Sequence, residues 1–194
     1  MNIILYNIAE YSHFILIIIS LFLLWNNNTL LYYYIIGVSL NELINILLKI
    51  LIKQDRPNTK KNNNTNEKDN ENDNNKSDIT DIANNDKNKL LSSNVQMYGM
   101  PSGHAQSVSF STMFIYLSLH NIYLTSFFII ISSISIFQRV YLKFHTIEQV
   151  IVGVLVGSFL SYLFYKLALK NYFPIIFKYK FLLLLFPISF IHVF

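Results

Sequence analysis

A succession of long apolar runs constrains this chain more than any other feature. A helix needs about 20 mostly apolar residues to cross the hydrocarbon core of a bilayer. Six segments approach that length, the third being short and rich in serine: 4–25, 30–52, 104–119, 122–138, 147–167 and 174–193. Lipid offers no partners for backbone polar groups, so such segments are expected to be helical. The sequence predicts an all-α, polytopic membrane bundle with about six transmembrane helices, formed as one domain over residues 1–194.

The composition excludes several classes of protein. Only 13% of the residues are charged and 53% are hydrophobic, whereas ordinary soluble domains have roughly 25% charged residues. A soluble monomer could not cover its surface with so few charges. The chain has no cysteine, which excludes disulfides, thiolate metal sites and cysteine nucleophiles.

One segment, residues 58–94, differs from the rest. It holds 13 asparagines, seven of the chain's 11 acidic residues and six of its 15 basic ones. Such a segment buries too little apolar area to offset the entropy of ordering, so we expect a disordered insert between the second and third spans. The nine bases left elsewhere form no stripe that could follow a phosphate backbone, and no nucleic acid partner is expected.

The first cluster of interest closes the second span. Lys49 is followed after six residues by Arg56 and Pro57, and Arg56 is one of only two arginines in the chain. Seven residues are close to two helical turns, which would place both cations on one helix face, about 10 Å apart. Pro57 disfavours helix at the residue before it. Taken alone, the pair is also explained as cations that snorkel at a membrane boundary.

The second cluster follows the insert, in the segment 99–106. Pro101 at a helix start, followed by Ser102 and Gly103, would present unpaired backbone N–H groups at the positive end of a helix dipole. That arrangement suits phosphate-like anions. His104, in the first helical turn, could deliver a proton to the same anion. Alone, this segment is equally an ordinary helix start.

The third cluster lies between the fourth and fifth spans. Arg139, the other arginine, offers a planar set of donors that matches phosphate oxygens. His145 is a candidate nucleophile or general base, because a neutral imidazole is available near pH 7. Gln149 lies one helical turn later, where it could accept a hydrogen bond from the other ring nitrogen. A purely structural role explains this cluster alone equally well.

Topology brings the clusters together. In a six-span chain, the loops after the second and fourth spans emerge on the same side, so all three clusters are expected to form one site. The remaining histidines have no comparable neighbours in sequence and are expected at the membrane interface: His13, His120 and His192.

Together, Lys49-x6-Arg56-Pro57, Pro101-Ser102-Gly103-His104 and Arg139-x5-His145 resemble the three-part signature of the type 2 phosphatidic acid phosphatase superfamily. The resemblance implies a haloperoxidase-like helical core and a phosphohistidine mechanism. His145 would be the nucleophile, His104 the proton donor, and Gln149 would orient His145. The phosphate-binding groups would be Lys49, Arg56, Ser102, Gly103 and Arg139. Neither a metal nor another cofactor is expected, because the few acids outside the insert are scattered.

Within the superfamily, segments 99–106 and 139–150 look like the dolichyl-diphosphatase branch, which also has Gln where most members have Asp, here Gln149. Gly103 and Gln138 stand where that branch usually has serine. The branch implies release of the terminal phosphate of dolichyl diphosphate, which recycles the lipid carrier of N-glycosylation in the endoplasmic reticulum membrane. The expected partners are this lipid substrate and the surrounding membrane lipids.

Two alternatives remain open. One is a broader lipid phosphatase that acts on phosphatidate or on other polyprenyl diphosphates, with the same site residues. The other is a non-catalytic binder or transporter of lipid phosphates, which would not need both His104 and His145. The positive-inside rule places the lysine-rich fifth loop in the cytoplasm and therefore the catalytic face in the lumen; its lysines are Lys166, Lys170, Lys178 and Lys180.

Overall fold

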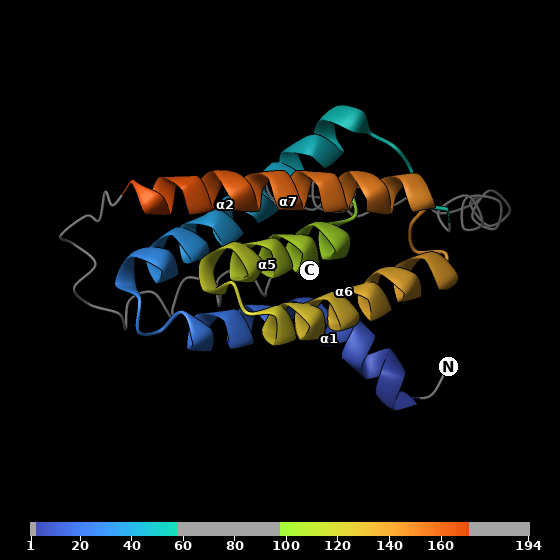
Figure 1. Cartoon of the computed structure of the whole chain (residues 1–194). Coiled ribbons are helices and arrows are strands. Elements are labelled where there is room, and N and C mark those ends of the chain that lie inside the picture. The colour runs from blue at the N-terminus through green and yellow to red at the C-terminus, as the bar shows by residue number, and fades with distance from the viewer. Residues whose placement is uncertain (1–2, 58–97, 171–194) are drawn as a thin grey trace, which may run out of the picture.

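A computed structural model describes residues 3–57 and 98–170 of the chain (Figure 1). That part consists of five helices: α1 (Ile3–Leu23), α2 (Asn28–Ile52), α5 (Gly103–Leu119), α6 (Ile122–Tyr141) and α7 (Ile147–Leu169). Its extended backbone pairing is limited to an isolated bridge between Asp55 and Tyr98. The predicted all-helical architecture is therefore confirmed for the described residues.

Four of these helices are long and apolar enough to cross a membrane, namely α1, α2, α6 and α7. Their outward faces carry large apolar side chains, which suit lipid tails rather than water; examples are Phe22, Leu47, Phe137, Leu155 and Phe159. The chain is thus a multi-pass membrane protein. The predicted count of six spans is not reached in the described part, because α5 is not among these four and segment 174–193 lies outside the described residues. The predicted insert 58–94 also lies outside them.

Helix α5 corresponds to the predicted third span, but it has only 17 residues. It contacts each of the other four described helices, and Figure 1 shows it between α7 and the pair formed by α1 and α6. Its hydroxyl groups bond to those neighbours: Ser111 Oγ lies 2.9 Å from the Tyr34 hydroxyl, and Thr112 Oγ1 lies 2.8 Å from Ser132 Oγ. This segment is rich in serine because it faces other helices rather than lipid.

Two glycines allow α5 and α7 to pack closely. A Cβ atom at Gly157 would collide with the carbonyl group of Gln106, and one at Gly153 would lie 2.6 Å from the carbonyl oxygen of Ser102. Glycines four residues apart line one helix face, which lets two backbones approach closely. The contact fixes the start of α5 against the first half of α7.

The end of α2 corrects one prediction. Lys53 adopts a left-handed conformation, with φ of 51°, and donates its N–H to the carbonyl oxygen of Lys49. The helix therefore ends at Ile52, and Arg56 lies beyond it, next to the bridge between Asp55 and Tyr98. The prediction that Lys49 and Arg56 share a helical face is wrong, because the left-handed residue turns the chain away before Arg56.

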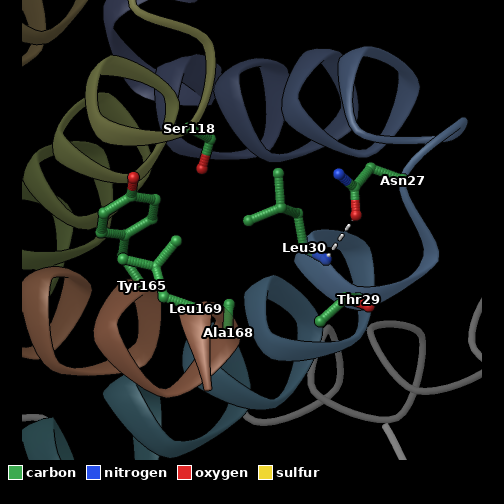
Figure 2. Close-up of a pocket in the computed structure, with 7 residues that line it drawn as sticks. All are labelled: Asn27, Thr29, Leu30, Ser118, Tyr165, Ala168 and Leu169. Atoms are coloured by element: carbon green, nitrogen blue, oxygen red, sulfur yellow. Dashed lines mark hydrogen bonds between the residues drawn. The ribbon is translucent and has the colours of Figure 1, made fainter. Parts of the chain in front are cut away.

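A pocket of about 410 Å3 opens where α2 begins and where α5 and α7 end (Figure 2). Asn27 lies at its rim and caps α2, its Oδ1 accepting a hydrogen bond from the N–H of Leu30 at 3.1 Å. The other residues that line it are Thr29, Ser118, Tyr165, Ala168 and Leu169. None of the predicted site residues is among them, because those lie toward the end of α2 and the starts of α5 and α7, and at the end of α6.

Candidate active site

The three sequence clusters meet at one end of the bundle. The segment after α2 pairs with the segment before α5, since the N–H of Gly99 donates to the carbonyl oxygen of Gln54 at 2.7 Å. The start of α5 is joined to α7, since the N–H of Ser102 donates to the carbonyl oxygen of Gln149 at 3.0 Å. These bonds bring together residues that lie far apart in the sequence, as the alternation of the helices predicts.

A tight loop between α6 and α7 places His145 next to Arg139. The carbonyl oxygen of Arg139 accepts hydrogen bonds from the N–H groups of Phe144 and His145, at 3.0 and 3.2 Å. Lys143 makes the turn possible with a left-handed φ of 58°. Thr146 then begins α7 with a capping box, in which its hydroxyl accepts from the N–H of Gln149. As a result, His145 is buried just before the start of α7.

Gln149 determines which nitrogen of His145 carries the proton. Its Nε2 donates to the carbonyl oxygen of Asp55 at 3.0 Å and to Oε1 of Gln54 at 3.3 Å. The amide oxygen Oε1 therefore faces the ring, 3.1 Å from Nδ1 of His145. An oxygen of this kind only accepts, so Nδ1 is protonated and Nε2 keeps its lone pair.

The surroundings keep this imidazole neutral. Burial, followed by the positive charge of Arg56, lowers the pKa of His145 from 6.5 to about 4. The hydrogen bond that Nδ1 donates to Gln149 opposes this lowering, while the charges of Lys49 and Arg139 add to it. A neutral imidazole with a free Nε2 lone pair next to three cations is suited to attack an anionic electrophile.

His104 lies in the first turn of α5, as predicted. Its Nε2 lies 3.3 Å from the carbonyl oxygen of Glu10 in α1. Because a carbonyl oxygen only accepts, Nε2 carries a proton and Nδ1 is the nitrogen that exchanges one. The ring of His13 lies against it, with centroids 4.2 Å apart. The expectation that His13 is an interfacial residue without comparable neighbours is therefore wrong, because α1 packs against α5.

Arg139 is buried at the end of α6. Its guanidinium lies over the ring of Phe144, 5.4 Å from the centroid, and its Nη2 lies 3.1 Å from Oε2 of Glu10. The separation allows charge attraction, yet Nη2 and Nε have no hydrogen-bond partner in the described structure. The pair with Glu10 thus lacks the angles of a hydrogen bond, and two donors of Arg139 remain for a ligand.

The other two cations sit on either side of the end of α2. Lys49 is buried in the last turn of that helix. Arg56 donates from Nε to the carbonyl oxygen of Tyr98 at 3.5 Å, and burial followed by the charge of Arg139 lowers its pKa. A cation buried near other cations is unfavourable unless an anion joins it. The three cations therefore concentrate positive charge at this end of the bundle, which suits a multiply charged anion.

The second cluster contributes a hydroxyl group, but fewer backbone donors than predicted. The Ser102 hydroxyl is buried and has no partner in the described structure. Its backbone N–H, predicted to bind the anion, instead donates to the carbonyl oxygen of Gln149. That part of the prediction is wrong, because close packing of α5 on α7 brings this carbonyl within reach.

A polar network in α2 holds the start of α5 in place. Asn45 donates from Nδ2 to Oε1 of Gln106 at 2.8 Å and to the carbonyl oxygen of Pro101 at 3.3 Å. Gln106 in turn donates to the carbonyl and side-chain oxygens of Asn41. A Cβ atom at Gly103 would lie 3.3 Å from Oδ1 of Asn45. A larger residue at this position would therefore require Asn45 to shift by a few tenths of an ångström.

Acidic residues do not gather at the site. In residues 3–57 and 98–170, no group of three His, Cys, Asp or Glu side chains is placed to hold a metal ion. The charge of a bound anion would be balanced by Lys49, Arg56 and Arg139. Glu10 contacts the predicted site through Arg139, and it was not among the residues predicted to form it.

The chain is similar to a known family and to known proteins. The model of the PAP2 superfamily matches residues 29–173, about three quarters of the chain. Lipid phosphate phosphatase epsilon 1, chloroplastic, of Arabidopsis thaliana is 29% identical over 141 residues, which are 69% of this chain and 39% of that protein. Lipid phosphate phosphatase epsilon 2, chloroplastic, of the same organism is 40% identical over 75 residues, 34% of this chain and 26% of that protein. The matched regions are thus well under half of either relative. No solved structure matches the chain.

Proposed function

Because the chain belongs to the PAP2 superfamily, we propose that it is a membrane lipid phosphatase that releases the terminal phosphate of dolichyl diphosphate. The observation that carries the proposal is the state of His145. Its Nε2 keeps a lone pair because Gln149 holds Nδ1, and three cations surround the ring. This is the arrangement that nucleophilic attack on a phosphate requires.

The first step forms a phosphohistidine. The substrate's terminal phosphate binds to Lys49, Arg56 and Arg139, with the Ser102 hydroxyl donating to one of its oxygens. Nε2 of His145 attacks the phosphorus in line, and the bond from phosphorus to the bridging oxygen breaks. His104, which takes up a proton when the anionic substrate binds, donates it from Nδ1 to that oxygen, and the lipid monophosphate leaves. The cations stabilise the charge on the transferring oxygens, which is the main source of catalysis in phosphoryl transfer.

The second step regenerates the enzyme. His104, now neutral, accepts a proton from water as the water oxygen attacks the phosphorus. The bond between phosphorus and Nε2 breaks, its electron pair returns to His145, and inorganic phosphate is released. Each proton that His104 gives in the first step is thus recovered in the second, and no metal or cofactor takes part.

The choice of substrate rests on sequence features. The glutamine at position 149 and the segment 139–150 resemble the dolichyl-diphosphatase branch, which supports dolichyl diphosphate as substrate and a lumenal catalytic face in the endoplasmic reticulum. The names of the relatives, lipid phosphate phosphatases, favour the second candidate, a broader lipid phosphatase. Gly103 in place of serine also fits this alternative, because the branch resemblance is weakest there.

Phosphate release by the purified full chain tests the proposal. The protein in detergent, with EDTA present, is expected to release phosphate from dolichyl diphosphate, and His145→Ala is expected to abolish the release. His120→Ala is the matched control, since His120 is exposed and lies at the far end of α5. Activity that survives His145→Ala would contradict the mechanism. A higher kcat/KM for phosphatidate would instead favour the broader phosphatase.

A further inference from the structure

The acidic side chain of Glu10 reaches the cationic site at Arg139. Oε2 of Glu10 lies 3.1 Å from Nη2 of Arg139, and this oxygen is shielded from solvent although 31% of the side chain is exposed. A carboxylate in a site for phosphate is unexpected, because it repels the ligand that the cations attract. A carboxylate at this position is therefore expected to affect phosphate binding during the reaction cycle.

The contact with Glu10 leaves hydrogen-bond donors of Arg139 without an acceptor in the described residues. A strong arginine–carboxylate pair has two parallel hydrogen bonds. Here both Nε and Nη2 of Arg139 lack a hydrogen-bond partner in the described residues. A phosphate could offer oxygens to both donors, so it would replace the carboxylate with better bonding geometry.

The position of Glu10 is fixed from two sides. Its backbone carbonyl accepts from Nε2 of His104 at 3.3 Å. Nearby, the carbonyl oxygens of α1 accept hydrogen bonds from α6, as that of Tyr6 does from Gln138 at 3.1 Å and that of Ala9 from Ser135 at 3.2 Å. The backbone that carries Glu10 is thus held beside Arg139 by packing of α1 on α6, while the side chain itself can move when phosphate binds.

We propose that Glu10 competes with phosphate for Arg139 and so promotes release of inorganic phosphate at the end of each cycle. This role rests on the proposed phosphatase function. In the empty site the carboxylate pairs with Arg139; bound phosphate displaces it; after hydrolysis the carboxylate returns as phosphate leaves. Glu10 is a positioning residue, because it acts on phosphate through Arg139.

The substitution Glu10→Gln tests the role. It removes the charge and keeps the size and the backbone carbonyl that holds His104. Without the competing charge, the Kd of inorganic phosphate is expected to fall by about tenfold, and so is its inhibition constant. The Kd is measured from the rise in Tm of the full chain in detergent as phosphate is added, which requires no turnover. Glu148→Gln is the matched control, since Glu148 is an exposed residue in the first turn of α7.

The direction in which the Kd of phosphate changes distinguishes this role from a structural one. Loss of a residue that only supports the fold would weaken phosphate binding, so an unchanged or higher Kd in Glu10→Gln would overturn the proposal. If Glu10→Gln does not fold, Glu10→Asp, whose shorter side chain withdraws the charge from Arg139, should lower the Kd by a smaller factor, and an unchanged Kd there would overturn it as well. In an Arg139→Gln background the effect of Glu10→Gln should vanish.

The same measurements keep the two proposals apart. Tighter phosphate binding in Glu10→Gln, from a protein whose wild type hydrolyses no lipid phosphate, would support the competition and contradict the phosphatase function. A wild type that hydrolyses lipid phosphates, with no change in phosphate affinity in Glu10→Gln, would contradict the competition alone.

Discussion

Nδ1 of His145 lies 3.1 Å from Oε1 of Gln149, whose Nε2 donates to the carbonyl oxygen of Asp55. A single neutral amide therefore joins the candidate nucleophile to the chain that leaves α2. A carboxylate in its place could accept from His145 but could not donate to Asp55. The amide thus orients the imidazole and also ties the first and third clusters together.

Substitutions of Gln149 should separate these two tasks. Gln149→Leu removes the acceptor, and we expect kcat to fall by about 10- to 100-fold, as when groups that orient a histidine are lost. Gln149→Glu keeps the acceptor, so its kcat should be higher than that of Gln149→Leu. Its Tm should still lie below that of wild type, because a carboxylate oxygen would face the carbonyl oxygen of Asp55. Steady-state kinetics and thermal unfolding measure both effects, and equal kcat values for the two variants would contradict the orienting role.

The proton donor is tested through the leaving group. His104→Ala should lower the rate on a lipid phosphate by about 10²- to 10⁴-fold, the usual contribution of general acid catalysis. With 4-nitrophenyl phosphate the loss should be much smaller, because nitrophenolate leaves without a proton. The ratio of the two losses is the measurement. Equal losses for both substrates would show that His104 binds or positions the substrate and does not donate the proton.

The lowered pKa of His145 predicts the pH below which its ring can no longer act as a nucleophile. Burial and the charge of Arg56 lower its pKa to about 4, so the ring should be neutral and competent as a nucleophile above that pH and lose this ability as the pH falls through it. Arg56→Gln removes a positive charge that disfavours the imidazolium, and should therefore raise the pKa of His145. Nitrogen-15 spectra of histidine-labelled protein measure the titration, with His145→Gln to assign the signal. A titration near the ordinary value of about 6.5 would contradict the prediction.

The close contact between α5 and α7 predicts that a larger side chain at Gly157 will destabilise the protein. Gly157→Val places branched carbons where even a Cβ would collide with the Gln106 carbonyl. Overpacking of this kind destabilises by about 1–3 kcal/mol or more, so the Tm should fall and activity should fall with it. Ser161→Ala, at a buried position of the same helix where the hydroxyl has no partner in the described structure, should leave the Tm nearly unchanged. A Gly157→Val protein as stable as Ser161→Ala would contradict the packing.

Sequence reasoning succeeded where spacing along the chain determines geometry. Gln149 lies one turn after His145, and the structure places the two within hydrogen-bond distance. The alternation of helices predicted that the three clusters meet at one end, and hydrogen bonds between those segments join them there. Such relations follow from helix geometry and from the order of spans, and both can be read from the sequence.

It failed where contacts depend on how distant helices pack. Nothing near Glu10 or His13 indicates that α1 lies against α5 and α6, so their contacts with His104 and Arg139 were missed. The end of α2 was missed because Lys53, a residue without a strong preference for the left-handed conformation, makes the turn. The N–H of Ser102 was expected to be free because its acceptor, the carbonyl of Gln149, comes from another helix.

The enclosure of α5 has a consequence for the membrane in which the protein works. A helix whose apolar stretch is longer than the hydrocarbon thickness tilts or kinks, whereas a shorter one thins the bilayer around it, and both adjustments fall on the helices that touch lipid. The helix that carries His104 is wrapped by its four described neighbours and is held to α7 through glycine contacts. Hydrolysis should therefore proceed at similar rates in vesicles made from lipids of different chain length, with the outer helices adapting to the bilayer.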